Sequence, residues 1–115
     1  MDELYQISVE VGDPEPKRAV KYLRFIIASV RAREGRIVKV WHGNEQTESK
    51  GRLKAPIRAA LRKMKREGTI RFFVCGEDFC EEDEVSRYLM EKFPMAREKD
   101  DDYGKRWDTY VIICL

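Results

Sequence analysis

His42 is the only histidine of the 115-residue chain, and it opens a polar segment, WHGNEQTESKGRLKAP, between a strand-like run and a helix-like run. An imidazole can serve as a general acid or base near neutral pH, and it can donate a hydrogen bond to a phosphate oxygen. His42 also follows a predicted parallel strand, and open α/β sheets bind ligands at the carboxyl ends of such strands. An isolated histidine after a strand is, however, more often a satisfied turn residue. The sequence leaves both alternatives open.

The segment behind His42 leads into a strongly basic helix. Gly43 to Gly51 bring flexible backbone to the start of this helix, where free N–H groups with Lys50 and Arg52 beside them would hold a phosphate. The order of a Walker loop is absent, so we do not predict binding of a nucleoside triphosphate. This loop is therefore a candidate site for the phosphate of a nucleic acid.

One face of the basic helix is apolar and the opposite face is cationic. Its cations are Lys54, Arg58, Arg62, Lys63, Lys65 and Arg66, and no acidic residue lies between Lys50 and Arg66. A solvated helix face is the common explanation, yet such a helix forgoes the mixed-sign i,i+4 pairs that are worth roughly 0.2–0.5 kcal/mol each. We therefore expect an anion to compensate it. A nucleic-acid backbone is one candidate, and the acidic segment 77–84 of the same chain is another.

Other residues that could take part in chemistry have mainly structural explanations. Cys75, Cys80 and Cys114 are an odd set without zinc-knuckle spacing, and strand-like surroundings favour buried thiols over a metal or redox role. Most aromatic residues follow strand or helix periodicity and are predicted to lie in the core. Tyr103 and Trp107 lie in a polar segment, where they could stack on bases or anchor the segment.

The elements that must position these residues alternate along the chain. Strands are predicted at 5–11, 36–41, 69–75 and 109–115, and helices at 16–33, 52–67 and about 84–93. Pro56 is compatible with the first turn of the second helix. The polar segment 97–108 is predicted to be a loop or a mobile excursion. The order βαβαβαβ predicts an α/β fold with a four-stranded mixed or parallel sheet layered against helices.

Bulk properties restrict the class of protein further. The length suits a single domain, 1–115, and 23 basic against 21 acidic residues leave a net charge of only +2, so any electrostatic argument depends on where the charges lie. No secretory signal and no run long enough to cross a bilayer is apparent, so we expect a cytoplasmic protein without a membrane partner. The sequence does not set the oligomeric state, and a monomer is one alternative.

Several of these residues resemble a known family. A strand running into His42-Gly43, then Gly51-Arg52-Leu53, a basic helix and the run EGTIRFFVCGEDF are similar to the Smr (small MutS-related) domain, whose hallmark is H-G-x-G-x-G followed by a leucine-arginine helix. The likeness covers the core, about residues 4–80. The C-terminal extension 81–115, with an extra helix and the last strand, resembles small stand-alone members.

The resemblance implies a fold, a partner and an activity. The expected fold is a two-layer α/β sandwich similar to the C-terminal domain of a translation initiation factor. The implied function is binding of DNA or RNA, here through the loop 42–52 and the helix 52–67. The residues expected to contact nucleic acid are His42, Gly43, Lys50, Gly51, Arg52, Lys54, Arg58 and Arg62.

Several family members also cleave nucleic acid with a metal ion, and this chain departs from their pattern. Their second motif, L-D-x-H-G, corresponds here to VEVGDP, so Glu10 replaces the aspartate and Gly12 stands at the histidine position. The alternative is therefore an endonuclease that uses His42 as acid or base, with Glu10, alone or together with Asp13, holding Mg or Mn. A further alternative is a protein-interaction module that docks an acidic partner. Without cleavage, no cofactor is expected.

Overall fold

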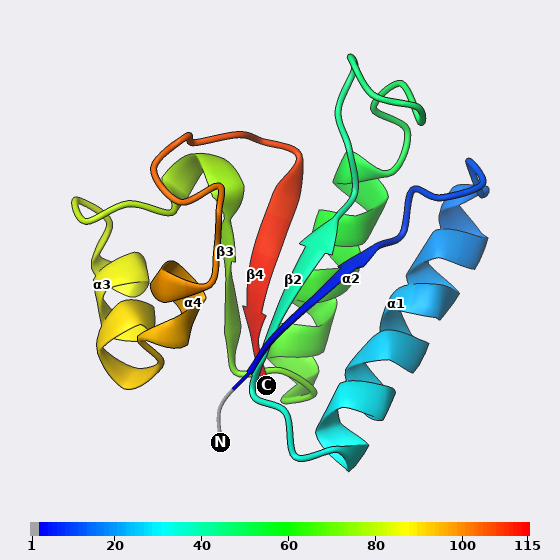
Figure 1. The fold of residues 1–115 in the computed structure, drawn as a ribbon. Coiled ribbons are helices and arrows are strands. Elements are labelled where there is room, and N and C mark those ends of the chain that lie inside the picture. The colour runs from blue at the N-terminus through cyan, green and yellow to red at the C-terminus, as the bar shows by residue number, and fades with distance from the viewer. Residues whose placement is uncertain (1–2) are drawn as a thin grey trace.

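The computed structural model describes residues 3–115, which fold into a four-stranded sheet flanked by helices (Figure 1). Its strands and helices are, in chain order, β1 (Leu4–Ser8), α1 (Pro16–Ala32), β2 (Ile37–Trp41), α2 (Lys54–Glu67), β3 (Phe72–Cys75), the 3₁₀ turn η1 (Gly76–Asp78), α3 (Glu84–Lys92), α4 (Met95–Glu98) and β4 (Tyr110–Cys114). The predicted α/β alternation is confirmed. The short helix α4 is an addition, and it takes up the start of the segment that was predicted to be a loop.

The strand order in space is β1-β2-β4-β3, so the last strand lies inside the sheet. β1 and β2 are parallel, as predicted, whereas β4 is antiparallel to β2 and to β3. The sheet is therefore mixed. β4 pairs with a strand on each side, so the region 81–115 contributes a central strand of the sheet. It is not an extension added to a core formed by residues 4–80.

Helices cover both faces of this sheet, which corrects the expected two-layer sandwich to three layers (Figure 1). α1 and α2 pack on one face over Val38, Val40 and Val111, while α3 and α4 pack on the other face over Ile37 and Ile112. The physical reason is the composition of the central strands, whose residues are apolar at both odd and even positions. Such strands leave no face that can remain in water.

Local signals set the ends of the helices. Pro16 occupies the first turn of α1, and Pro56 lies in the first turn of α2, where no intrahelical N–H bond is lost. Gly68, with a φ of 80°, ends α2 in the left-handed conformation that a residue without Cβ adopts at least cost. The Asp83 side chain caps α3 by accepting from the Ser86 N–H at 2.9 Å. These helix ends agree with the predicted ones within about two residues.

None of the helices in residues 3–115 has the length and the apolar character needed to span a membrane.

Lys39 is a buried cation in the middle of β2, and it holds the segment before β4 against the sheet. Its Nζ donates to Asp100 at 2.6 Å and to Asp102 at 2.5 Å, and it lies 4.2 Å from the centre of the Trp41 ring and 4.4 Å from that of Tyr110. A buried ammonium is tolerated only when carboxylates and rings replace its water shell. Of the two alternatives predicted for the segment 97–108, a loop or a mobile excursion, these ionic contacts favour an anchored loop.

We expect Lys39→Met to lower the free energy of unfolding by about 3–5 kcal/mol, because the Asp100 and Asp102 carboxylates would lose their counter-ion. Urea denaturation measures this change. The same substitution at Lys99, which is exposed, is the control and should cost less than about 0.5 kcal/mol. Equal stability of the two variants would contradict an anchoring role for Lys39.

Candidate nucleic-acid interface

His42 lies directly after β2, and its side chain is fully buried. Its ring Nδ1 lies 2.8 Å from the Gly43 carbonyl oxygen, and the Arg58 Nε–H donates to its Nε2 at 3.2 Å. Because a carbonyl only accepts and a guanidinium only donates, the ring must carry its proton on Nδ1 and be neutral. Neither ring nitrogen is therefore open to a phosphate in this conformation.

The environment of His42 keeps it neutral over a wide pH range. Burial is the main reason that the pKa of His42 falls to about 4, and the positive charges of Arg58 and Lys54 lower it further. The Gly43 carbonyl and Glu77 oppose this effect only in part. A neutral imidazole at pH 7 cannot donate a proton as a general acid, and a base this weak is poorly matched to catalysis near pH 7.

The Glu10 carboxylate organises the polar loop from within. Its Oε2 accepts from the Ser49 N–H at 2.9 Å, from the Ser49 hydroxyl at 2.5 Å and from the Thr47 hydroxyl. Partial burial acts to raise the pKa of Glu10, but the hydrogen bonds from Ser49 and Thr47 outweigh it and hold the pKa below its ordinary value. Glu10 therefore orders the loop between Gly43 and Gly51, which was expected to be flexible because of its glycines.

Gly43 is required at its position by both conformation and space. Its φ is 80°, and a Cβ placed there would lie 2.0 Å from Glu10 Oε2 and 2.3 Å from Thr47 Oγ1. Its backbone N–H donates to the Thr109 carbonyl at 3.0 Å, as the His42 N–H does at 2.9 Å. The His42-Gly43 pair therefore joins the end of β2 to the start of β4, and its backbone N–H groups are already used.

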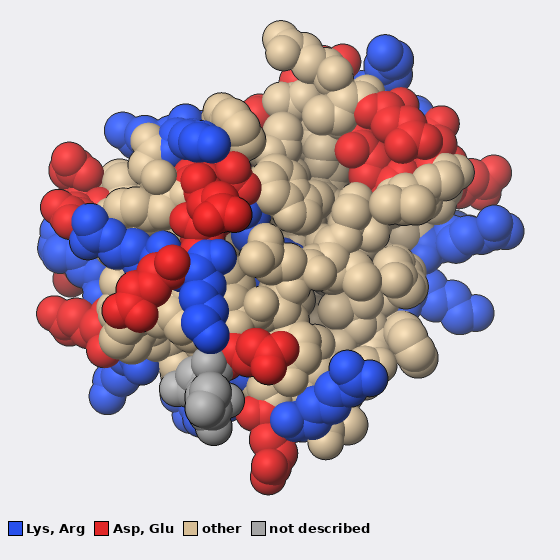
Figure 2. Space-filling model, in the orientation of Figure 1, with Lys and Arg blue, Asp and Glu red and all other residues tan. Residues whose placement is uncertain are grey.

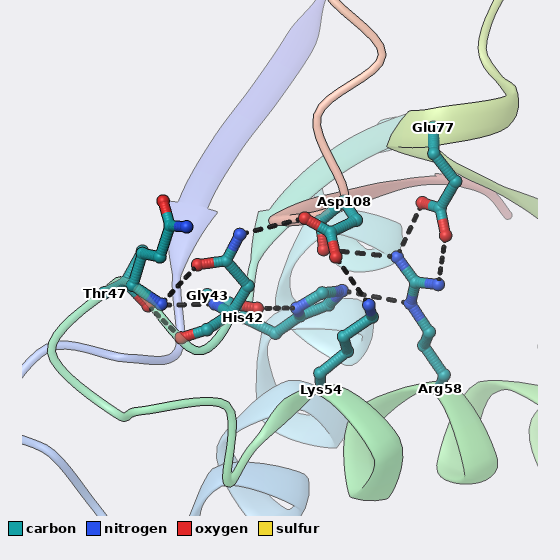
Figure 3. A network of polar contacts seen from close by, with 9 residues as sticks. His42, Gly43, Thr47, Lys54, Arg58, Glu77 and Asp108 are labelled. Atoms are coloured by element: carbon teal, nitrogen blue, oxygen red, sulfur yellow. Dashed lines mark hydrogen bonds and ion pairs between the residues drawn. The ribbon is translucent and has the colours of Figure 1, made fainter.

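Lys54 and Arg58, two cations of the predicted phosphate site, are bound to carboxylates of the same chain (Figure 3). Arg58 makes a bidentate contact with Glu77 at 2.7 and 2.8 Å, and Lys54 donates to Asp108 at 2.6 Å. Asn44 also donates to Asp108 at 2.9 Å, and these hydrogen bonds from Lys54 and Asn44 lower the pKa of Asp108 to about 2. The compensating anions near the start of α2 are thus internal.

The remaining predicted contact residues lie apart from this network. Arg52 is exposed and pairs with Asp13, and Lys50 is exposed in a left-handed turn followed by Gly51. Arg62 projects into solvent one turn beyond Arg58. The structure therefore gathers His42, Gly43, Lys54 and Arg58 around one buried polar network, and it leaves Lys50, Arg52 and Arg62 at the surface.

The exposed charges are divided between the two helical layers. Among their charged residues, α1 and α2 include only one acid, Glu67. Seven of the nine exposed cations of these two helices define a basic face, namely Lys17, Lys21, Arg24 and Arg31 of α1 with Arg62, Lys63 and Arg66 of α2. The two helices pack against each other on the same face of the sheet. On the other side, acidic residues dominate the segments around α3 and α4, namely Glu77, Asp78, Glu81 to Glu84 and Asp100 to Asp102. The nearly neutral net charge conceals this separation.

Sequence reasoning missed several residues that shape this region. Asp108 was predicted only as part of a segment that is a loop or a mobile excursion, although a carboxylate two residues before the last strand was a usable signal once that strand is known to be central. Tyr103 anchors its segment, as one of the two alternatives predicted, by packing edge-on against Phe79 with 5.0 Å between ring centres. Most of the periodic aromatic residues are buried or half-buried, as expected, but Tyr22, Phe25 and Tyr88 are exposed.

The cysteines and the acidic residues show no further site. Cys80 and Cys114 are buried, burial raises the pKa of Cys75 and Cys114, and no disulfide forms among residues 3–115. Within the same residues, no group of three or more His, Cys, Asp or Glu side chains is arranged to hold a metal ion. Asp13, considered as a partner of Glu10 on a metal, instead pairs with Arg52.

Comparison of the chain with protein-family models, with curated proteins and with solved structures found no match. The resemblance to Smr domains therefore stays a prediction from the motif residues, and the functional argument must come from the geometry described above.

The pKa of His42 predicts a specific loss of stability in acid. Because its pKa is about 4 in the folded state and 6.5 in the unfolded state, the unfolded chain takes up the proton first. The contribution is present above pH 6.5 and is lost as the pH falls toward 4, by up to about 3 kcal/mol. We expect the stability difference between wild type and His42→Gln, measured by urea denaturation, to shrink across this interval.

Carboxylates with lowered pKa values titrate in both proteins, so the difference between them isolates His42. A stability difference that stays constant from pH 7 to pH 4.5 would contradict the neutral, buried state of the ring.

Gly43→Ala should be markedly more destabilising than Gly104→Ala. Both glycines have positive φ, 80° and 86°, so each variant carries the same left-handed strain, but nothing lies within 4 Å of a Cβ at Gly104. Overpacking against Glu10 and Thr47 should add about 1–3 kcal/mol at Gly43. Thermal and urea denaturation of the two variants measure this difference. Equal losses of stability would contradict the predicted clash, because they would show that Glu10 and Thr47 can move away from the added Cβ.

Proposed function

We propose that this protein binds the phosphate backbone of DNA or RNA through the basic face of α1 and α2. The observation that carries the proposal is the separation of charge between the two helical layers. A surface with seven outward cations and one neighbouring acid creates a positive field that attracts a polyanion, while the acidic side of the molecule repels it. The basic face is therefore the side of the protein that should meet the nucleic acid.

This proposal places the phosphate contacts differently from the sequence-based expectation. Lys54 and Arg58 are occupied by Asp108 and Glu77, so a phosphate would have to displace a carboxylate from each of them. Lys21, Arg62 and Arg66 are exposed and need no such displacement. The exposed cations therefore carry the proposed contact, with Lys50, in the loop that leads into α2, at one end. Arg52 is exposed there too, but it would first have to leave Asp13.

We do not extend the proposal to cleavage. His42 is the residue on which an Smr-type endonuclease mechanism would depend, and both of its ring nitrogens are engaged in hydrogen bonds. Glu10 is likewise committed to Thr47 and Ser49. Because His42 has no free ring nitrogen and the Glu10 Oε2 atom already accepts three hydrogen bonds, this arrangement favours binding over cleavage.

Binding of fluorescently labelled DNA and RNA, each as a single strand and as a duplex, across a salt series tests the proposal. The observed affinity should fall steeply with salt, because each neutralised phosphate releases counter-ions. Lys21→Gln with Arg62→Gln should weaken binding at least tenfold at low salt, by a rough estimate, and reduce the salt slope by about 2.

The control is Arg87→Gln with Lys92→Gln, which removes the same charge from exposed positions on α3. It should leave the affinity nearly unchanged. Absence of binding at low salt would contradict the proposal. Equal losses of affinity in the two double variants would contradict it as well, because they would show that binding depends on net charge alone.

A further inference from the structure

Two large aromatic side chains lie exposed on α1 beside the basic face. Phe25 is 65% exposed and Tyr22 is 40% exposed, and their rings are nearly parallel, with centroids 6.4 Å apart and planes inclined by 15°. They stand one helical turn apart and outside the buried stripe of α1, which contains Leu23, Ile26 and Ile27. Neither ring is needed to complete the core, so their exposure requires another explanation.

The rings border a groove between α1 and the edge strand β1. This groove has a volume of about 270 Å³ and is lined by Tyr5 and Ile7 of β1 and by Tyr22, Phe25, Ser29 and Arg33 on the side of α1, among other residues. Figure 2 shows a band of uncharged side chains over the front of the molecule, where β1 passes α1, with Lys and Arg side chains projecting at its right border and Asp and Glu side chains at its upper right and lower ends. The groove is mainly apolar, and Arg33 is the charged residue that lines it.

Cations flank the aromatic pair along the helix axis. Arg18 lies one turn before Tyr22, and Arg33 lines the far end of the groove, so both follow the same side of α1 as the rings. At 1.5 Å per residue the two guanidinium-bearing positions are about 22 Å apart, which leaves room for a few nucleotides between them. No acidic residue occurs in α1.

We propose that this groove is a stacking site for the unpaired bases of single-stranded nucleic acid. The bases would stack on Tyr22 and Phe25, while Arg18 and Arg33 with the adjacent basic face would hold the phosphates. This inference rests on the proposed phosphate-binding function and specifies its substrate as a single strand. Every base has a π-face, so such a site tolerates many sequences.

A single strand fits these features better than a duplex. The bases of a duplex already stack on one another and their faces are hidden, so a duplex would reach only the cations. A single strand can use the rings and the cations together. An acidic peptide would satisfy the cations as well, but only a peptide that also carries aromatic side chains could stack on the two rings, whereas every nucleotide brings both a phosphate and a planar base.

The test compares 15-nucleotide thymine and uracil single strands with a 15-base-pair duplex at fixed salt. Wild type should bind both single strands more tightly than the duplex. Tyr22→Ala and Phe25→Ala should each weaken single-strand binding by roughly tenfold and leave duplex binding nearly unchanged. Phe25→Trp should retain single-strand binding, whereas Phe25→Leu, which keeps apolar volume without a π-face, should not.

Tyr88→Ala is the matched control, because Tyr88 is 46% exposed on α3, on the side of the molecule where acidic residues dominate. It should leave both affinities unchanged. Strong binding of single strands and duplex that is insensitive to Tyr22 and Phe25 would overturn the stacking site and leave the phosphate proposal standing. No binding to any oligonucleotide would overturn both.

A peptide partner is distinguished in the same assay by a polyglutamate competitor. Polyglutamate could displace the single strand as effectively as unlabelled strand does, while Phe25→Leu still binds the single strand as tightly as wild type. These two results together would show that the groove accepts any acidic chain, and they would overturn the inference.

Discussion

Strand β4 pairs with β2 on one side and with β3 on the other, and the arrangement of the whole molecule depends on this insertion. Because β4 is antiparallel to its neighbours, its first two residues lie opposite the last residues of β2 and β3, as the Trp41 to Tyr110 and Cys75 to Val111 registers show. The segment that leads into β4 must therefore cross the carboxyl ends of these strands. Ligands commonly bind at these strand ends in open parallel sheets.

The crossing segment fills that position with its own polar groups. The Thr109 carbonyl accepts the N–H groups of His42 and Gly43, and Asp108 takes the ammonium of Lys54. Glu77, at the start of η1, takes Arg58 from the other side. The charged side chains of this network, Lys54, Arg58, Glu77 and Asp108, are thus paired within the chain, as partly buried charges must be.

Neutrality of His42 is a consequence of the same packing. Burial removes the water that would solvate an imidazolium, and two cations stand close to the ring. The histidine is therefore a connector between a turn carbonyl and a guanidinium.

With the strand ends closed, the surfaces left open to a partner are the helical layers, and α1 and α2 combine exposed cations with an exposed aromatic pair. The field of the basic face would guide a polyanion, while contacts at the rings would distinguish paired from unpaired bases.

The sequence by itself determined much of the fold. Helix and strand periodicity, Pro16, Pro56 and Gly68 act within a few residues, so the elements and their ends could be predicted from local rules. The basic character of α2 was equally visible, since it is a property of composition. The spatial order of the strands depends instead on contacts between residues far apart in the chain. Only the tertiary structure could show that β4 is central, that Asp100 and Asp102 reach Lys39, and that Asp108 and Glu77 neutralise the cations expected to bind phosphate. Burial decides the charge of His42, and burial is a property of the packed chain rather than of any segment.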